Sequence, residues 1–539
     1  MPDYTFANGQ TTPIPGVTEY TEKVVLSQPG PTPAFMVPML LGDSPSGYPY
    51  NYDSLKKTTE DAEGPFRMIR TDSLLHDTYG TGSEIAIGFR NSQAEGLPMA
   101  FVGNLCALTR AQVIATSTGP VNEMYIYSRL FGAPGGHNQV KWASSILTIS
   151  PVQRYAMLSV AVATTDTRIY VTGNDPDLSP IGWMTAGMTV YLGDSDTADF
   201  AVVVSAVGRQ LNSTGQWQYY FDLTAAAGTA VEISTKYGCV VLLGPDVVSS
   251  AFTSGQGQAL IDWINTNSTT LGAIAHASFT GALPAVVSSS TAIKDIGGWG
   301  TATVGTSPAS TTSDWTTFFT DYKATYWNQF RTIFSARPYL HLLLTSSATN
   351  HATARAFAIE RRTLNLTPVS ILSGAAFTDT STSASDGTNC AYRARALNQQ
   401  DVILFGGAMG WLPPYLTLAA SAFGQLAANG SKYSITRKII KSTGAAVQKM
   451  WDQANSGQLA YLIKNGVVTY MLNDANPPQW VFTSGVNTNQ DRATTWSPET
   501  NTTCMVAARN SINEFMSGLL TLLGSYSGNT EVTDSDVGQ

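Results

Sequence analysis

The sequence has few charged residues. Lys, Arg, Asp and Glu make up 13% of its 539 residues, against about 25% in a typical soluble domain. The formal charge of −8 disfavours extended contact with nucleic acid. A surface of neutral Ser, Thr, Ala and Gly instead suits repeated contact between proteins. We therefore expect a protein with protein partners and no direct nucleic-acid partner.

Long apolar runs are also lacking. No stretch approaches the ~18 apolar residues of a membrane span. The first residues, MPDYTFANGQ, contain neither the basic segment nor the apolar segment of a signal peptide. We expect a soluble protein that is made in a cytoplasm and does not insert into a membrane.

Cysteine and histidine are scarce and scattered. The chain has no Cys-x-x-Cys pair, phosphate loop, nucleophile elbow or His-Glu-x-x-His helix. We interpret the cysteines as buried, reduced thiols and the histidines as ordinary surface or packed residues. The sequence thus predicts no cofactor, no metal site and no catalytic residue. The residues concerned are Cys106, Cys239, Cys390, Cys504, His76, His137, His276, His341 and His351.

Most of the chain alternates between strand and helix patterns, which predicts a mainly parallel sheet covered by helices on both faces. Helical spacing over Thr71–Gln93 is weakened by Gly80 and Gly82 in its middle. The expected strands are Ala34–Leu41, Leu97–Leu105, Cys239–Leu243, Leu271–Ser278, Tyr339–Thr345, Thr367–Leu372 and Asp401–Phe405, and the expected helices after residue 238 are Gln256–Thr266, Asn350–Arg362 and Asn389–Leu397.

Residues 107–237 differ, because short β runs alternate there with Gly, Asn and Asp turns. The predicted fold class is α/β and α+β multidomain: a mainly parallel α/β core with an inserted all-β domain, an α+β C-terminal domain and an extended N-terminal arm. The predicted boundaries are 1–33 for the arm, 34–106 and 238–441 for the core, 107–237 for the insertion, 442–524 for the C-terminal domain and 525–539 for an acidic, disordered tail.

One stretch, Asp401–Lys441, joins the core to the expected C-terminal domain. A strand and a Gly-rich turn precede Pro413 and Pro414, which suit the first turn of a helix. Tyr415–Ala428 then has helical spacing and many small residues, so another element can pack very close to it, and Asn429-Gly430 ends it. A basic segment comes next, which reads either as a solvated face or as a contact with an acidic protein partner. Its residues, with those nearby, are Lys432, Arg437, Lys438, Lys441, Lys449 and Lys464.

The C-terminal part contains a hairpin pattern. Asn465-Gly466 separates the apolar runs Leu459–Lys464 and Val467–Leu472, which is typical of a two-residue type I′ turn. Trp480–Thr483 could add a third strand, and Thr503–Leu523 is an amphipathic helix pattern.

This order of parts resembles the tail sheath proteins of contractile phage tails, which are related to the sheaths of contractile injection and secretion systems. Pro15-Gly16-Val17 with the run to Leu26, and then Ala34–Gly42, resemble the opening of a sheath protein. The other segments that carry the resemblance are Ala394–Phe405, Trp411–Ala428, Leu459–Leu472, Trp480–Thr488 and Met505–Leu520.

The resemblance implies a structural subunit, not an enzyme, that stacks as hexameric rings around a tail tube and contracts during genome delivery. Its implied partners are copies of itself, the tail tube protein, and baseplate and tail terminator proteins. Its implied location is the virion tail, assembled in the host cytoplasm. The arm would donate a strand through Val17, Tyr20, Val24, Val25 and Leu26. The accepting hairpin would be Leu459, Tyr461, Ile463, Val467, Thr469 and Met471, and the tube-facing residues Arg437, Lys438, Lys441 and Lys449.

Two other functions remain open from sequence. Another virion protein, of the baseplate or an adhesion structure, could use the β insertion to bind a receptor. A glycoside hydrolase could stack sugars on an aromatic stripe, although that spacing indicates a buried helix face first. The stripe is Trp315, Phe318, Phe319, Tyr322, Tyr326 and Phe330.

Overall fold

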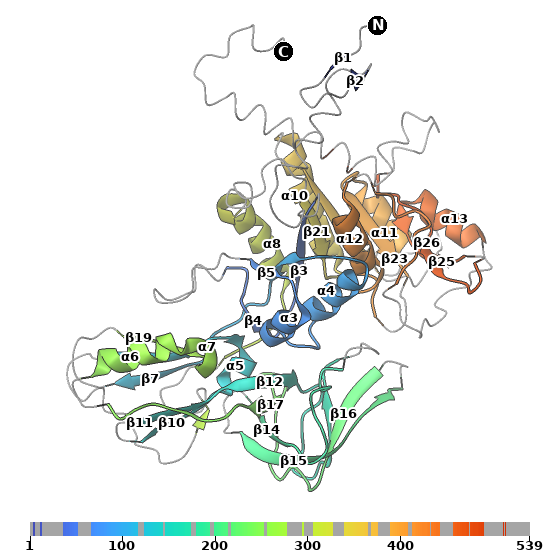
Figure 1. Cartoon of the computed structure of the whole chain (residues 1–539). Coiled ribbons are helices and arrows are strands. Elements are labelled where there is room, and N and C mark those ends of the chain that lie inside the picture. The colour runs from blue at the N-terminus through green and yellow to red at the C-terminus, as the bar shows by residue number, and fades with distance from the viewer. Residues whose placement is uncertain are drawn as a thin grey trace, which may run out of the picture.

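The structure is a computed structural model, shown in Figure 1. It describes residues 4–5, 11–12, 36–51, 66–116, 123–143, 146–173, 179–194, 199–213, 217–252, 256–277, 294–295, 305–326, 339–364, 368–375, 389–407, 412–431, 433–441, 456–473, 475–489, 510 and 513.

A mostly parallel sheet forms the centre of the molecule. Its described strands lie in the order β24-β23-β22-β21-β3-β6-β5, and all neighbours are parallel except β5 and β6. This confirms the predicted parallel sheet. The bounds are β3 Val37–Gly42, β5 Arg67–Ile69, β6 Ala100–Asn104, β21 Tyr339–Leu343, β22 Val369–Ala375, β23 Val402–Gly406 and β24 Val467–Val468.

Helices cover both faces of this sheet, and each face has its own hydrophobic core. One face carries α3 Asp72–Tyr79, α4 Glu84–Ala94 and α12 Leu418–Asn429. The other carries α8 Thr312–Asp321, α10 Ala348–Thr363 and α11 Cys390–Leu397. Successive side chains of a strand point to opposite faces, so strands buried on both sides read as continuous apolar runs.

The single helical pattern at 71–93 is two helices. Gly80 has a φ of 77°, a left-handed value that favours glycine, and the side chain of Ser83 then accepts a hydrogen bond from the backbone N–H of Ala86 to begin α4. Pro413 and Pro414 likewise stand before α12 and not in its first turn, because the helix begins at Leu418.

The small residues of α12 allow the close contact that the sequence predicts. A Cβ placed on Gly424 would lie 2.1 Å from the carbonyl oxygen of Ser92 in α4. Nearby, the side chain of Asn91 donates a hydrogen bond of 2.6 Å to the carbonyl oxygen of Leu416. The backbone of α12 at Gly424 therefore lies directly against the backbone of α4 at Ser92, on one face of the core.

Antiparallel strands between β6 and β21 form a separate lobe, seen below the core in Figure 1. One part has the sheets β19-β8-β7 and β18-β11-β10-β20, with helix α6 Gly257–Thr266 in its hydrophobic core; the other is the sheet β12-β17-β14-β15-β16-β13. The bounds are β7 Gln112–Thr116, β8 Glu123–Ser128, β10 Gln139–Ala143, β11 Ile146–Ser150, β12 Val152–Met157, β13 Arg168–Val171, β14 Thr189–Gly193, β15 Phe200–Leu211, β16 Trp217–Leu223, β17 Cys239–Leu243, β18 Val247–Val248, β19 Ala273–Ala277 and β20 Lys294–Asp295.

Placing Cys239–Leu243, Gln256–Thr266 and Leu271–Ser278 in the parallel core is wrong. β17 pairs antiparallel with β12 and β14, and β19 pairs antiparallel with β8. Short apolar runs look the same in parallel and antiparallel sheets, so periodicity could not assign them. The antiparallel lobe therefore continues past the predicted boundary at residue 237. It also contains helix α6, so it is not an all-β domain.

The hairpin predicted at Asn465-Gly466 is also wrong. Leu459, Tyr461 and Ile463 lie on helix α13 Ser456–Lys464, and Gly466, two residues after the end of this helix, has a φ of 81°. Val467 is on β24 in the core sheet, Thr469 follows it, and Met471 is on β25 Tyr470–Leu472. Residues that tolerate a left-handed conformation end helices as readily as they form hairpin turns, so the dipeptide fits both.

Several predictions fall outside the described residues: the arm positions Val17, Tyr20, Val24, Val25 and Leu26, the basic residue Lys449, most of the helix at 503–523, and the tail at 525–539. Near the N-terminus, β1 Tyr4–Thr5 and β2 Thr11–Thr12 pair with each other. Among the helices that the structure describes, none has the length and apolar character of a membrane span.

Candidate assembly site

The basic segment after α12 forms the outer part of a small antiparallel sheet. The backbone N–H of Arg437 donates to the carbonyl of Phe482 at 3.0 Å, and that of Phe482 donates to the carbonyl of Lys438 at 3.0 Å. β26 Trp480–Phe482 pairs on its other side with β25. The segment 437–440, β26 and β25 thus lie side by side, and we call them the small sheet.

Buried hydrogen bonds fix the small sheet to the core. The carboxylate of Glu95, which follows α4, accepts from the side-chain amide of Gln425 at 2.8 Å and from the backbone N–H of Lys441. The same amide of Gln425 donates to the carbonyl of Ile439 at 2.7 Å. Burial and the charge of Glu95 raise the pKa of Tyr433. The α4–α12 pair therefore sets the position of the basic segment.

The small sheet presents basic and apolar groups outward. Arg437, Lys438 and Lys441 are exposed. Ile439 is 42% exposed and Leu472 37%, although both are large and hydrophobic. The described residues pair no further strand with the outer edge of β25. An unpaired strand edge offers main-chain hydrogen bonds to another chain, and the basic groups would favour an acidic partner.

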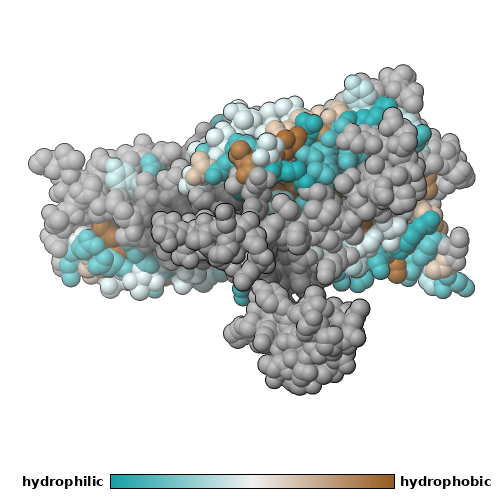
Figure 2. All heavy atoms as spheres, turned by 90° about the horizontal axis from the view of Figure 1, so that it is seen from above, coloured by the Kyte–Doolittle hydropathy of each residue, from teal (hydrophilic) through white to brown (hydrophobic). Residues whose placement is uncertain are grey.

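In the view of Figure 2, hydrophobic residues on the described surface are scattered among hydrophilic ones and form no broad patch. An exposed apolar patch of several hundred Å² is the usual mark of a contact surface. The described part of this face shows no such patch.

A second anchor ties the C-terminal segment to the core. The hydroxyl of Ser370, on β22, donates to the side-chain oxygen of Asn510 at 2.7 Å, and the amide of Asn513 donates to the carboxylate of Asp401 at 3.2 Å. Arg362 pairs with Asp401 as well. Burial raises the pKa of Asp401, and Arg362 and Asn513 oppose that shift. Sequence reasoning missed this network; its signal was two asparagines three residues apart in a helix pattern.

The aromatic stripe is a buried helix face in the part described. Trp315, Phe318, Phe319 and Tyr322 are at most 3% exposed and pack against α10 and the sheet, whereas Phe330 and the side chain of Tyr326 lie outside the description. These four rings are closed to a sugar.

The described cysteines, Cys106, Cys239 and Cys390, are buried and free, as expected. Within the described ranges, no three His, Cys, Asp or Glu side chains are arranged to hold a metal ion.

No family model matches the chain, and no curated protein matches it. Solved structures that are similar to it include two sheath tail proteins. A sheath tail protein from Desulfitobacterium hafniense is 11% identical, with a TM-score of 0.43, over 93% of this chain and 82% of that one. The sheath tail protein Lin1278 from Listeria innocua is 10% identical, with a TM-score of 0.47, over 96% of this chain and 84% of that one.

Proposed function

We propose that this chain is the structural subunit of a contractile tail sheath. It polymerises as stacked hexameric rings around a tail tube, between a baseplate and a tail terminator, in a virion tail assembled in the host cytoplasm. Contraction drives the tube through the host envelope during genome delivery, and its work comes from surface buried between subunits.

The observation that carries the proposal is the small sheet, which is fixed to the core yet open at β25. The outer edge of β25 has no strand partner among the described residues, and Leu472 on it is exposed. Strand addition to such an edge supplies affinity through main-chain hydrogen bonds and needs little side-chain specificity. The sequence resemblance provides the strand: Val17–Leu26 of a neighbouring copy.

The basic segment has a separate role in this proposal. Arg437, Lys438 and Lys441 face the tail tube and set the register and approach of the subunit. Charges at a contact rim act more on association rate and specificity than on affinity, so neutralising them should slow assembly on tubes more than it weakens the finished sheath.

The test is assembly of the purified full-length protein, followed by sedimentation and negative-stain microscopy. Full-length protein should form rings or tubes. A variant that lacks residues 1–26, and the variant Leu472→Asp, should stay monomeric with unchanged circular dichroism. Leu364→Asp is the matched control, because Leu364 is 58% exposed at the end of α10, away from the small sheet; it should assemble normally.

Tubes formed without residues 1–26 would contradict the strand donor. Tubes formed by Leu472→Asp would contradict the accepting edge. Two results together would contradict the sheath and favour a baseplate or adhesion protein. The purified full-length protein would stay monomeric, and electron microscopy of virions with labelled protein would show the label only at the tip of the tail.

A further inference from the structure

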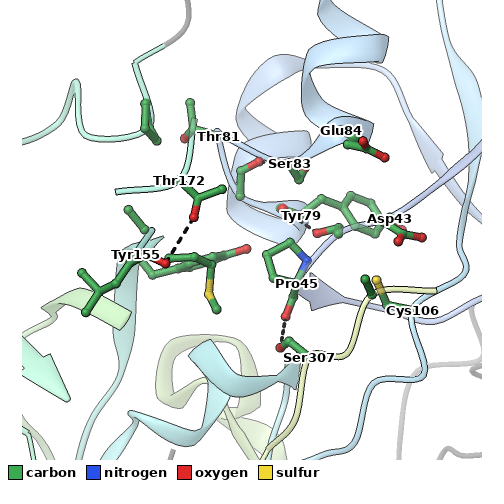
Figure 3. Close-up of a pocket in the computed structure, with 18 residues that line it drawn as sticks. Asp43, Pro45, Tyr79, Thr81, Ser83, Glu84, Cys106, Tyr155, Thr172 and Ser307 are labelled. Carbon is green, nitrogen blue, oxygen red and sulfur yellow. Dashed lines mark hydrogen bonds between the residues drawn. The ribbon is translucent and has the colours of Figure 1, made fainter. Parts of the chain in front are cut away.

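A cavity of about 280 Å³ lies where the core meets the antiparallel lobe. Figure 3 shows its lining residues. They come from the end of β3, from the junction of α3 and α4, and from β12 in the antiparallel lobe. The proposed assembly site uses none of them.

The cavity lies next to the end of β3, where the order of strands in the parallel sheet reverses. β3 pairs with β6 on one side and with β21 on the other, so the order of strands reverses there. Asp43 follows β3 directly and reaches the cavity. In open parallel sheets, ligands bind outside the carboxyl ends of the strands where the order reverses.

Two carboxyl groups lie at one end of the cavity, as Figure 3 shows for Asp43 and Glu84. One oxygen of Asp43 accepts from the backbone N–H of Ser310 at 2.8 Å. Its other oxygen, Oδ1, is buried and has no hydrogen-bond donor in the described structure. Glu84 accepts from the hydroxyl of Tyr415 at 2.7 Å. The described lining contains no Lys, Arg or His.

No positively charged side chain in the described lining compensates these carboxyl groups. Burial raises the pKa of Glu84 to about 7, with a further contribution from the charge of Asp43 and an opposing one from the hydrogen bond of Tyr415. Burial likewise raises the pKa of Asp43, and hydrogen bonds from Ser310 and Cys106 oppose that shift. A buried carboxylate is costly unless a positive charge or donors offset it. A cation would supply both the charge and the donor that Asp43 Oδ1 lacks.

The rest of the lining is largely apolar. Tyr79, Tyr155, Met157, Leu158 and Pro180 contribute to it. Apolar and aromatic walls with a few converging polar groups are typical of small-molecule sites. Such walls accept hydrocarbon, and aromatic rings also attract cations. The arrangement fits a molecule with a positive head and a short apolar body.

We propose that this cavity binds a small organic ammonium ion. The ammonium group lies between Asp43 and Glu84 and donates to Asp43 Oδ1, and the hydrocarbon extends toward Tyr155 and Met157. This site acts independently of the sheath proposal, because neither its residues nor its ligand belongs to the small sheet.

The test is calorimetric titration of the full-length protein with n-butylammonium, n-butanol and butyrate as matched probes. At pH 8, butylammonium should bind at least tenfold more tightly than n-butanol, and butyrate should not bind. From pH 8 to pH 6, the affinity for butylammonium should fall by about tenfold, because a proton competes with the ligand for a carboxylate whose pKa is about 7.

Glu84→Gln and Asp43→Asn should each remove most of this affinity, since they keep the side-chain shape and remove the charge. Glu232→Gln is the control, because that residue is partly exposed and does not line the cavity. Equal binding of n-butanol, or no binding of any probe, would overturn the proposal without any variant. So would unchanged binding in both carboxyl variants, or an affinity that does not change with pH.

Discussion

His341 lies in the middle of the parallel sheet with no exposed surface. Burial lowers its pKa to about 3, and that of His351 to about 4. The hydroxyl of Tyr322 lies 3.3 Å from Nε2 of His341, and Nε2 of His351 lies 2.9 Å from the carbonyl oxygen of Thr345. These histidines are thus packed core residues, one of the two ordinary roles that the sequence predicts for them.

The pH dependence of the free energy of unfolding should reflect the protonation of His341 and His351. Their folded pKa values lie below the unfolded value of about 6.5, so the unfolded state binds protons first as pH falls. The free energy of unfolding should therefore decrease below pH 6.5, by about 1.4 kcal/mol per pH unit for each histidine, down to pH 4.

Denaturant unfolding of the wild type and of His341→Leu between pH 7 and pH 4 measures this. As pH falls, the free energy of unfolding of the wild type should decrease more than that of His341→Leu. A constant difference would mean that His341 is protonated in the folded protein.

At the scale of elements, the contact between α4 and α12 depends on one glycine. Alanine normally stabilises a helix by about 1 kcal/mol relative to glycine. At Gly424, however, a Cβ would lie 2.1 Å from the carbonyl oxygen of Ser92. Separating two packed helices costs about 1–3 kcal/mol, which outweighs the gain.

Gly424→Ala should therefore lower the free energy of unfolding by up to about 2 kcal/mol, measured by denaturant unfolding. Gly182→Ala is the control, since the nearest atom to its Cβ would lie 3.5 Å away; it should change stability little. A stabilised Gly424→Ala would show that α4 and α12 can move apart freely.

Local sequence patterns predicted some elements correctly and could not distinguish between two structures for others. The helices and strands of the core follow from apolar spacing and caps, because strands buried on both faces have a distinctive composition. The pair Asn465-Gly466 led to a wrong prediction, because it fits both a hairpin turn and the end of a helix. The outcome depended on the pairing of Val467 and Val468 with β23. That contact joins segments far apart in the chain.

At the scale of the whole molecule, a buried ion pair links the parts of the antiparallel lobe. His137 follows the short helix α5 Ala133–Gly136, and its Nδ1 lies 2.7 Å from the carboxylate of Asp199, between β14 and β15. Burial lowers the pKa of His137, but the charge of Asp199 and its hydrogen bond outweigh burial, and the pKa lies well above its usual value. The contact with Asp199 therefore favours the protonated form of His137.

Removal of one partner should cost more than removal of both. His137→Leu removes the ion-pair partner of the buried Asp199, which costs about 3–5 kcal/mol. The double variant His137→Leu/Asp199→Leu should recover a large part of this, because no charge remains buried. Thermal unfolding followed by circular dichroism measures both, with Asp199→Leu completing the cycle. Additive effects of the two substitutions would contradict a direct ion pair.

The sequence by itself determined the alternation of strands and helices in the core, the small-residue helix and the buried aromatic stripe, because local spacing and side-chain size carry that information. Only the tertiary structure decided which strands share a sheet, as with β17 and β19. It also decided that α13 replaces a hairpin, that Asn510 and Asn513 anchor the C-terminal segment, and that Asp43 and Glu84 meet in one cavity. Each depends on contacts between residues distant in sequence, whose free energy no local pattern records.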